Sequence, residues 1–506
     1  MATTLTSEGV TEWTRPRHDR AGLTHADCCA FQGRLRCASM ADDTRWPTFR
    51  AGEQPRAVVV AVQTRGVDDG EVESSIAELE RLAKTLGLAP IGRITQRRPT
   101  LAPGVVLGEG KLRELATWTG GPGVVAPYQK PGHAAHDDEG DDADDAAEAA
   151  AVASTELAPD APRATVVLVD HDLSPTQQRN LEKASGVDVL DRTSVILEIF
   201  QRHAKTREAM LQVEIARLKY LAPRLRESSG GADRVRGGVG GKGAGETSLE
   251  LDRRRIRDRI AELNHELAQI EGDADIRRHR RSDLPTVALV GYTNAGKSSL
   301  MRALTTTDVY IADKLFATLD TTVRRLQPPT EPPILVTDTV GFIKKLPHDL
   351  VASFRSTLDE ARDADLLLHV IDASDPAHAD QLAVTREVLG ELGAREMPTW
   401  LLLNKIDRVD AAGRALLAER YPDALRLSAK LPADVAALRD KMIELFAGAL
   451  EEVELDVPWA AQRVIHSIHE RATVLAEAHH DAGTRVRLRA PARVVAALRA
   501  ELEPPA

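Results

Sequence analysis

The sequence predicts an α/β protein of several domains: a small N-terminal parallel α/β domain, an antiparallel helical hairpin, a central doubly wound α/β domain and a small C-terminal α+β domain. Three observations predict this fold class. The 506 residues allow about three domains of roughly 150 residues each. Apolar strands alternate with segments of helical period in two separate regions, which is typical of parallel sheets. Two long helical segments joined by a glycine-rich stretch lie between those regions.

The overall composition argues against several classes of protein. With 66 Lys and Arg against 77 Asp and Glu, the formal charge is −11, whereas a protein that coats nucleic acid is usually basic. Charged residues make up 28% of the chain, and no apolar run of about 18 residues could span a bilayer, so membrane insertion is not expected. The N-terminal residues lack the apolar core of a signal peptide. We therefore expect a cytoplasmic protein, and a monomer.

Two segments are predicted to be disordered. Residues 1–53 form an N-terminal extension with Cys28, Cys29 and Cys37, which have no partner at zinc-finger spacing. Residues from about 117 to 162 form an acidic insertion. Within it, residues 133–160 hold seven Asp, three Glu and no Lys or Arg, a composition too polar to offset the entropy of ordering. This stretch accounts for most of the net charge, so the rest of the chain is close to neutral.

The N-terminal domain, residues 54–192, reads as a small parallel α/β unit that the acidic insertion interrupts. We expect buried strands at 56–61 and 164–170, and shorter strands after Leu86–Leu88 and within 186–192. Helices are expected at 71–86 and 174–185, because apolar residues recur there every three or four positions.

The helical hairpin, residues 193–282, follows. The first helical stretch (194–226) carries Leu211, Ile215 and Leu218 in its seam, and a glycine-rich loop occupies 229–245. The second helix (247–280) has a heptad-like stripe: Leu249, Ile256, Ile260, Leu263, Leu267 and Ile270. Residues 201–260 hold fifteen Lys and Arg against eight Asp and Glu. The hairpin is therefore either a spacer with a solvated surface or a contact arm for RNA or another phosphate-rich partner.

The central domain, residues 283–449, begins with a phosphate-binding motif. The apolar strand 286–290 runs into GYTNAGKSS (291–299) and then an apolar helix, the context that the G-x-x-x-x-G-K-S pattern requires. Gly291 and Gly296 allow the backbone N–H groups to face phosphates. Lys297 supplies charge to the outer phosphates, and the Ser298 hydroxyl is placed to bind Mg²⁺.

A second motif, DTVG (338–341), closes the apolar strand 334–338. Asp338 suits a carboxylate that holds Mg²⁺ through water, and the Gly341 N–H suits a contact to the γ-phosphate. The next residue is Phe342, at a position where many GTPases carry a Gln that orients the attacking water. We therefore expect slow intrinsic hydrolysis, with the missing group supplied by a partner, a potassium ion or another segment.

Two further motifs indicate guanine. The strand and loop TWLLLNKID (399–407) place Asp407 where its carboxylate can accept hydrogen bonds from guanine N1–H and the 2-amino group, donors that adenine does not offer there. Asn404 holds this loop and Lys405 lies along the base. In SAK (428–430), the Ala429 N–H is expected to reach guanine O6. The domain is thus predicted to bind GTP rather than ATP.

The first switch is expected within FATLDTTVRR (316–325). A switch threonine reaches Mg²⁺ only when the γ-phosphate is present. Thr318 is our choice, Thr321 and Thr322 are rivals, and the residues alone barely separate them. The alternative is a surface loop whose threonines have no such role.

These motifs, with the long blocks that precede them, resemble the HflX family of ribosome-associated GTPases. The resemblance extends over about residues 56–506. It rests on GYTNAGKSSL, LFATLD, DTVGFI and NKID, on RRPTLAPGVVLGEGK (97–111) and DLSPTQQRNLE (172–182), and on the hairpin blocks 191–225 and 237–260. It implies docking of the N-terminal part and hairpin on the large (50S) ribosomal subunit, and a role in ribosome dissociation, rescue or maturation. A rival outside this class is a GTP-gated scaffold that acts through the hairpin without a ribosomal partner.

The same resemblance implies the site. It favours Thr318 as the switch residue, and it implies direct Mg²⁺ contacts by Ser298 and Thr318, with Lys297, Thr318 and Gly341 in catalytic roles. It also implies ATP binding in the N-terminal domain, to which Gly108, Gly110 and Lys111 could contribute. The nucleotide contacts that it implies are Gly291, Tyr292, Thr293, Asn294, Ala295, Gly296, Lys297, Ser298, Phe316, Ala317, Thr318, Leu319, Asp320, Asp338, Thr339, Val340, Gly341, Asn404, Lys405, Ile406, Asp407, Ser428, Ala429 and Lys430.

The C-terminal domain, residues 450–506, reads as strand, helix and strand over 453–491, similar to the small C-terminal domain of some family members. Four histidines (His466, His469, His479 and His480) suggest a metal cluster at first sight. They fall in what we predict to be a helical segment, without the carboxylates and spacing of a known site. We expect them to be solvated.

Overall fold

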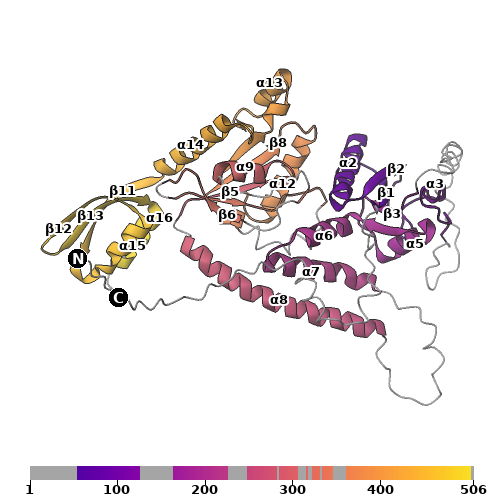
Figure 1. Ribbon diagram of the computed structural model, residues 1–506, viewed down its shortest axis with the longest axis horizontal. Helices are drawn as coiled ribbons and strands as arrows, with labels where there is room; N and C mark the ends of the chain where they lie inside the picture. Colours follow the sequence, from indigo (N-terminus) through magenta and orange to yellow (C-terminus); the bar gives the residue numbers. More distant parts are fainter. Residues whose placement is uncertain are drawn as a thin grey trace, which may run out of the picture. The chain divides into compact units, whose positions relative to one another are not determined.

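The computed structural model describes residues 54–125, 163–225, 248–281, 284–305, 315–316, 322–330, 333–345 and 360–502 (Figure 1). The three cysteines and residues 133–160 lie outside these ranges. Three sheets are present in the described part of the chain: one of four strands, one of six and one of three. The predicted α/β fold class is confirmed.

The four-stranded sheet belongs to the N-terminal domain. Its strands are all parallel, in the order β2-β1-β3-β4. They are β1 (Arg56–Gln63), β2 (Ala89–Arg97), β3 (Val166–Val169) and β4 (Asp188–Asp191). Its helices are α2 (Asp69–Leu86), α3 (Glu109–Thr119), α5 (Pro175–Ser185) and α6 (Arg192–His203). Valines of β1 pack with leucines of α3 and α5 in one core, while α2 and α6 contact each other and the sheet.

The predicted disordered insertion begins too early. Residues 117–119 complete α3, whose last turn is closed by Gly120 in the left-handed conformation. The backbone then passes close to α5, where Gly123 N–H donates to Ala184 O at 2.9 Å. The acidic residues of the insertion begin only at Asp137. The charge of the sequence therefore did not support a start of the disordered insertion at residue 117.

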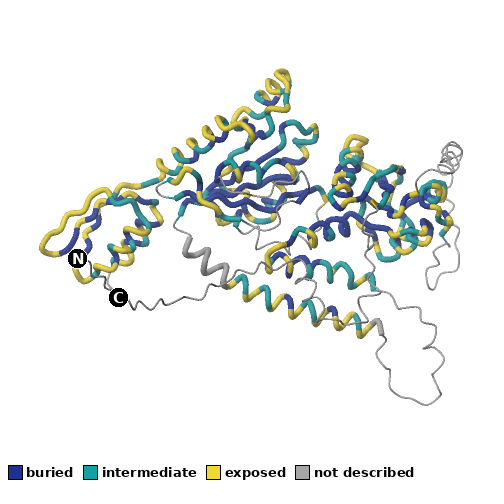
Figure 2. The backbone as a smooth tube through the Cα atoms, viewed as in Figure 1, coloured by how far each residue is buried: buried dark blue, intermediate teal, exposed yellow. Residues whose placement is uncertain are grey.

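The hairpin pairs α7 (Arg207–Leu221) with α8 (Ser248–Arg281). The predicted single helical stretch over 194–226 is wrong, because α6 ends at His203 and the 3₁₀ turn η2 (Ala222–Arg224) follows α7. Ala204 is extended, and the Thr206 side chain caps α7 by accepting from Ala209 N–H. Seven residues of the predicted apolar seam are confirmed: Leu211, Ile215, Leu218, Ile260, Leu263, Leu267 and Ile270. Ile256 is buried but is not part of this cluster, and the side chain of Leu249 lies outside the described residues. In Figure 2, the described part of α8 is mostly exposed or intermediate, and Ile256 and Leu263 are its buried positions.

The central domain is built on the six-stranded sheet, in the order β10-β9-β8-β5-β7-β6. Only β6 runs antiparallel to its neighbour. The strands are β5 (Thr286–Gly291), β6 (Thr322–Arg325), β7 (Leu335–Asp338), β8 (Leu366–Asp372), β9 (Thr399–Asn404) and β10 (Leu425–Arg426). The helices are α9 (Lys297–Thr305), α12 (His378–Glu391), α13 (Ala411–Arg420) and α14 (Pro432–Gly448), with the 3₁₀ turn η4 (Ile406–Arg408).

Two separate apolar cores make this domain doubly wound. One core joins α9 and α14 to the sheet, and the other joins α12 and α13 to it. The central strands β5 and β8 are buried along most of their length (Figure 2). Ligands of such folds bind outside the carboxyl ends of the parallel strands. The predicted motifs follow β5, β7 and β9 at this edge.

The C-terminal domain is an antiparallel sheet, β11-β13-β12, with helices on one side. Its elements are β11 (Leu450–Pro458), η5 (Trp459–Ala461), α15 (Arg463–Arg471), β12 (Thr473–His480), β13 (Gly483–Pro491) and α16 (Ala492–Leu502). The predicted strand, helix and strand omit one of the three strands, β12, and the final helix. His479 and His480 lie on β12 rather than on a helix. The segment forms a strand because it pairs with β13 in an antiparallel hairpin.

Candidate functional site

The phosphate-binding loop joins β5 to α9, and its two glycines have backbone conformations that exclude other residues. Gly291 has φ 143°, and a Cβ atom there would lie 2.1 Å from the Val370 carbonyl oxygen of β8. Gly296 has φ 100°, and a Cβ atom there would lie 2.2 Å from the Asn404 amide nitrogen. Glycine is therefore required by close approach as well as by φ.

Lys297 begins α9 and is turned back toward the loop. It is 6% exposed, and its Nζ donates to the carbonyl oxygens of Gly291 (3.0 Å) and Tyr292 (2.9 Å). Burial lowers the pKa of Lys297 to about 8, although the charge of Asp338 acts in the opposite direction. A phosphate anion next to this amine would favour its charged form. The side chain is thus placed to receive the outer phosphates.

Ser298 and Asp338 bring together the predicted metal-binding oxygens. The Ser298 hydroxyl donates to Asp338 Oδ2 at 2.8 Å, so a hydroxyl oxygen and a carboxylate oxygen lie side by side. Next along the chain, the Thr339 hydroxyl donates to Leu289 O at 2.7 Å and ties DTVG to β5. Hydroxyl and carboxylate oxygens are the ligands that Mg²⁺ prefers, so this pair fits the ion.

The NKID loop is joined to the phosphate-binding loop through two side chains. Asn404 is 1% exposed; its Nδ2 donates to Ala295 O at 2.8 Å, and its Oδ1 accepts from Ala429 N–H at 3.0 Å. Lys405 Nζ donates to Asn294 O at 2.7 Å and pairs with Asp372 at 2.8 Å. The Ala429 N–H thus has an acceptor within the protein, and its contact with guanine O6 stays a prediction.

Asp407 lies in η4 with an exposed carboxylate. A hydrogen bond from Ser428 is the main cause that lowers the pKa of Asp407. Ser428 is itself held in place, because its N–H donates to Asp434 Oδ2 at 2.7 Å. The SAK segment therefore orients the carboxylate, as a guanine-binding site requires.

Only part of the predicted first switch falls within the described residues. Phe316 is buried, has φ 57°, and its ring meets that of Phe200 edge to face at 4.6 Å between centroids. Thr322 begins β6. Ala317, Thr318, Leu319, Asp320 and Thr321 lie outside the described residues, so the choice of Thr318 stays a prediction.

The segment after DTVG is hydrogen-bonded to the phosphate-binding loop. Phe342 O accepts from Thr293 N–H at 2.8 Å, and Phe342 N–H donates to Gly291 O at 3.1 Å. Phe342 is 2% exposed, so its ring is part of the core. The phosphate-binding loop and the segment after DTVG are therefore joined by two backbone hydrogen bonds.

Comparisons with known proteins agree with this geometry. Residues 73–124 and 147–201 match the model of the GTP-binding GTPase N-terminal region, residues 203–281 match the GTP-binding GTPase middle region, and residues 286–405 match the 50S ribosome-binding GTPase model. GTPase HflX of Gluconacetobacter diazotrophicus is 56% identical over 88% of this chain and 98% of its own length. The chain belongs to the HflX family of GTPases. It therefore binds GTP and GDP and hydrolyses GTP.

Two other known proteins are also similar to this chain. GTPase HflX of Escherichia coli is 38% identical over 81% of this chain and 87% of its own length. A GTP-binding protein of Sulfolobus solfataricus in complex with GDP is 24% identical over 77% of this chain and 98% of its own, with a TM-score of 0.38. This structural likeness is too weak to add to the sequence match. No helix in the described residues is long and apolar enough to cross a membrane.

A buried cluster of charged side chains lies beside the phosphate-binding loop of this HflX-family GTPase. The sequence did not predict this cluster. The Tyr292 hydroxyl donates to Glu78 of α2 and accepts from Lys344 N–H at 2.7 Å. Glu78 also pairs with Arg192, the first residue of α6. A sequence signal did exist, since Glu78 stands among the buried positions Ile76, Leu79 and Leu82 of α2. A charged residue on an apolar stripe points to a buried partner.

A second carboxylate completes this cluster. Asp170, at the end of β3, accepts from Arg192 NH1 at 2.7 Å and from Lys345 Nζ at 2.8 Å. Burial would raise the pKa of Asp170, but the charges of Arg192 and Lys345 hold it below its usual value. Tyr292 of the phosphate-binding loop and Lys345 of the segment after DTVG thus share one charge cluster with the N-terminal domain.

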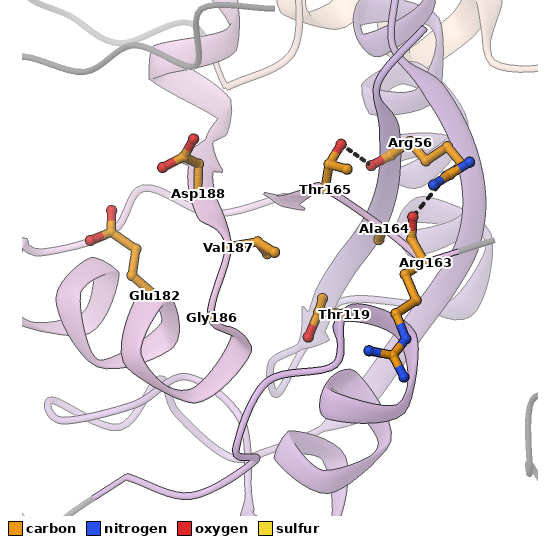
Figure 3. A pocket seen from close by; sticks show the side chains of 9 residues that line it. All are labelled: Arg56, Thr119, Arg163, Ala164, Thr165, Glu182, Gly186, Val187 and Asp188. Atoms are coloured by element: carbon orange, nitrogen blue, oxygen red, sulfur yellow. Dashed lines mark hydrogen bonds between the residues drawn. The ribbon is translucent and has the colours of Figure 1, made fainter. Parts of the chain in front are cut away.

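The residues that suggested ATP binding lie at the start of α3. Gly108 N–H donates to Gln96 Oε1 at 2.8 Å, and Lys111 Nζ is paired with Glu114 at 2.9 Å. The amine is therefore already neutralised by a carboxylate. A hollow of about 650 Å³ lies elsewhere in this domain, at the amino ends of β1, β3 and β4. Its lining includes Arg56 and Asp188 (Figure 3).

Within the described residues, no group of three or more His, Cys, Asp or Glu side chains could hold a metal ion. His466, His469 and His480 each lie near one carboxylate instead: Glu470, Glu477 and Asp456 respectively.

Proposed function

We propose that this HflX-family GTPase binds the large (50S) ribosomal subunit and that its nucleotide state governs this association. In this proposal the protein acts in the cytoplasm, in ribosome dissociation or rescue or in subunit maturation. The observation that carries it is the exposed basic side of α8, in a chain whose central domain matches the 50S ribosome-binding GTPase model.

The two sides of α8 differ in chemistry. Its apolar stripe packs against α7. Near its start, the surface outside this stripe exposes four arginines: Arg253, Arg254, Arg255 and Arg257. Guanidinium groups form paired hydrogen bonds with phosphate oxygens. A helix that is fixed on one side and basic on the other is suited to contact an RNA backbone.

The nucleotide site would supply the switch. In this proposal Ser298 and Thr318 hold Mg²⁺ directly, Asp338 holds it through water, and the ion neutralises charge on the β- and γ-phosphates. Lys297 contacts the outer phosphates and the Gly341 N–H contacts the γ-phosphate. Loss of that phosphate would release the second switch, which begins at Gly341 and carries the contacts of Lys345 with the N-terminal domain.

Co-sedimentation with purified ribosomal subunits tests the proposal. The full-length protein is expected to migrate with large subunits when it holds a non-hydrolysable GTP analogue, and less so with GDP. Turnover is expected to be slow alone and faster with large subunits, because Phe342 cannot orient water. Failure to co-migrate in the analogue-bound state, with GTP hydrolysis intact, would favour a GTP-gated scaffold. Parallel runs with precursor subunits separate maturation from dissociation.

Charge reversal on α8 is expected to weaken this association. A variant with Arg253, Arg254 and Arg255 changed to Glu should bind large subunits less tightly. Each lost phosphate contact makes the negative slope of log affinity against log salt shallower by about 0.7–0.9. The loss of three contacts should therefore make it shallower by about two to three. A matched control reverses three exposed arginines outside the hairpin: Arg395, Arg414 and Arg499. Equal binding by both variants would contradict an RNA contact by α8.

A further inference from the structure

The γ-phosphate end of the nucleotide site lacks a polar side chain at the position after Gly341. Phe342 has no hydrogen-bonding group on its ring, which is buried. Its backbone groups are both used, in the bonds with Gly291 and Thr293. A different residue must therefore supply any side-chain hydrogen bond to the reacting phosphate.

Thr293 carries a buried hydroxyl that has no acceptor. Thr293 is 6% exposed, and its Oγ1 has no hydrogen-bond partner in the described part of the chain. By contrast, the hydroxyls of Ser298 and Thr339 are each bonded. An unpaired buried hydroxyl destabilises the folded protein, because it has lost its hydrogen bonds to water. Valine would fill the same volume without this cost, so a bound ligand is the natural partner of the hydroxyl.

The position of Thr293 identifies that ligand. A Cβ atom added to Gly341 would lie 2.8 Å from Thr293 Cγ2 and 2.9 Å from Lys297 Nζ. The Thr293 side chain, the Lys297 amine and the Gly341 backbone therefore meet around one point. The lysine and glycine of these motifs contact the γ-phosphate. The Thr293 methyl group lies nearest to that point, and a rotation of about 120° about χ1 in one direction moves the hydroxyl to the position that the methyl group now holds.

We propose that the Thr293 hydroxyl donates a hydrogen bond to a γ-phosphate oxygen of GTP and acts as a catalytic residue in hydrolysis. Water attacks the γ-phosphorus, and the bond from phosphorus to the β,γ-bridging oxygen breaks. The electron pair leaves with GDP, and a proton of the water passes to the released phosphate. A donor fixed beside the γ-phosphate stabilises this transition state. The inference rests on GTP hydrolysis alone and is independent of the ribosomal partner.

Two substitutions test this role. Thr293→Val removes the hydroxyl and keeps the shape, whereas Thr293→Ser keeps the hydroxyl. In single-turnover hydrolysis of bound GTP without ribosomes, Thr293→Val is expected to be slower by about 100- to 1,000-fold, and Thr293→Ser should restore most of the rate. The affinity for GDP should fall far less than the rate of hydrolysis in Thr293→Val, because GDP has no γ-phosphate for the hydroxyl to contact.

The GDP affinity also shows whether each variant is folded. Hydrolysis by Thr293→Val at the unmodified rate would overturn the proposal. So would an equal loss in Thr293→Ser, because the hydroxyl would then not be the group that matters. A parallel loss of GDP affinity would also overturn it, since it would show that Thr293 only shapes the loop.

Discussion

Replacement of Arg192 by alanine is expected to lower the free energy of unfolding of the N-terminal domain by about 3–5 kcal/mol. Arg192 is 1% exposed and is paired with Glu78 and Asp170, each 2% exposed. Without the guanidinium, two carboxylates stay buried with much of their compensating charge removed. Breaking a buried ion pair from one side is costly because the remaining charge has lost its solvation.

Arg93→Ala is the matched control for this prediction. Arg93 also pairs with two carboxylates of α2, Glu73 and Glu80, but it is 42% exposed. Water replaces such a partner, so the loss should be at most about 1 kcal/mol. Hydrogen exchange measured on peptides from β1 and β3 reports the stability of this domain within the full chain. Equal protection in the two variants would contradict the prediction.

The pH dependence of the Arg192→Ala effect is a second readout. Arg192 and Lys345 hold the pKa of Asp170 below its usual value, so this carboxylate stabilises the fold above its unfolded pKa of about 3.9. That contribution is lost as the pH falls through the folded pKa. The difference between the unmodified protein and Arg192→Ala should therefore be largest near neutral pH and shrink in acid. A difference that grows in acid would be inconsistent with a buried charge cluster.

Residues whose role depends on local spacing could be predicted from sequence. The phosphate-binding loop connects β5 directly to α9. Its glycines, Lys297 and Ser298 could therefore be assigned from one short stretch of sequence. Asp338 and Asn404 end their own strands. Because parallel strands share one carboxyl edge, their order along the chain was enough to place them near one another.

Contacts between residues far apart in the sequence could not be predicted in this way. Glu78 and Tyr292 are separated by 214 positions, and no periodicity connects them. The break between α6 and α7 was missed for a different reason. The residues on either side are helix formers, and a single capping threonine, Thr206, decides the boundary. On β12, Ala476, Ala478 and their neighbours favour a helix locally, but pairing with β13 determines a strand.

Asp407→Asn is expected to change the base that the GTPase binds. Asp407 is predicted to offer two acceptor oxygens to guanine, one for N1–H and one for the 2-amino group. Asparagine replaces one acceptor with an NH₂ donor, which faces the 2-amino donor of guanine. The affinity for GDP should therefore fall by about 100-fold or more, since a site with mismatched buried donors rejects its ligand strongly.

Xanthine nucleotides should bind the Asp407→Asn variant with increased affinity, whereas guanine nucleotides bind it with reduced affinity. Xanthine keeps N1–H but carries a carbonyl oxygen at position 2, which accepts from the asparagine NH₂. Xanthosine diphosphate should therefore bind Asp407→Asn more tightly than GDP does, whereas the unmodified protein should show the reverse order. ADP should gain no affinity, because adenine has no N1–H. Equilibrium binding of the three diphosphates measures this order directly.

Asp410→Asn is the matched control, because it makes the same chemical change three residues away. The Asp410 carboxylate accepts from Gly413 N–H at 2.8 Å and caps α13, a role that asparagine performs equally well. This variant should keep the preference for GDP. Its net charge equals that of Asp407→Asn, so a difference between the two comes from the position of the carboxylate and not from total charge. A preference for GDP that survives in Asp407→Asn would mean that the exposed carboxylate held by Ser428 does not read the base.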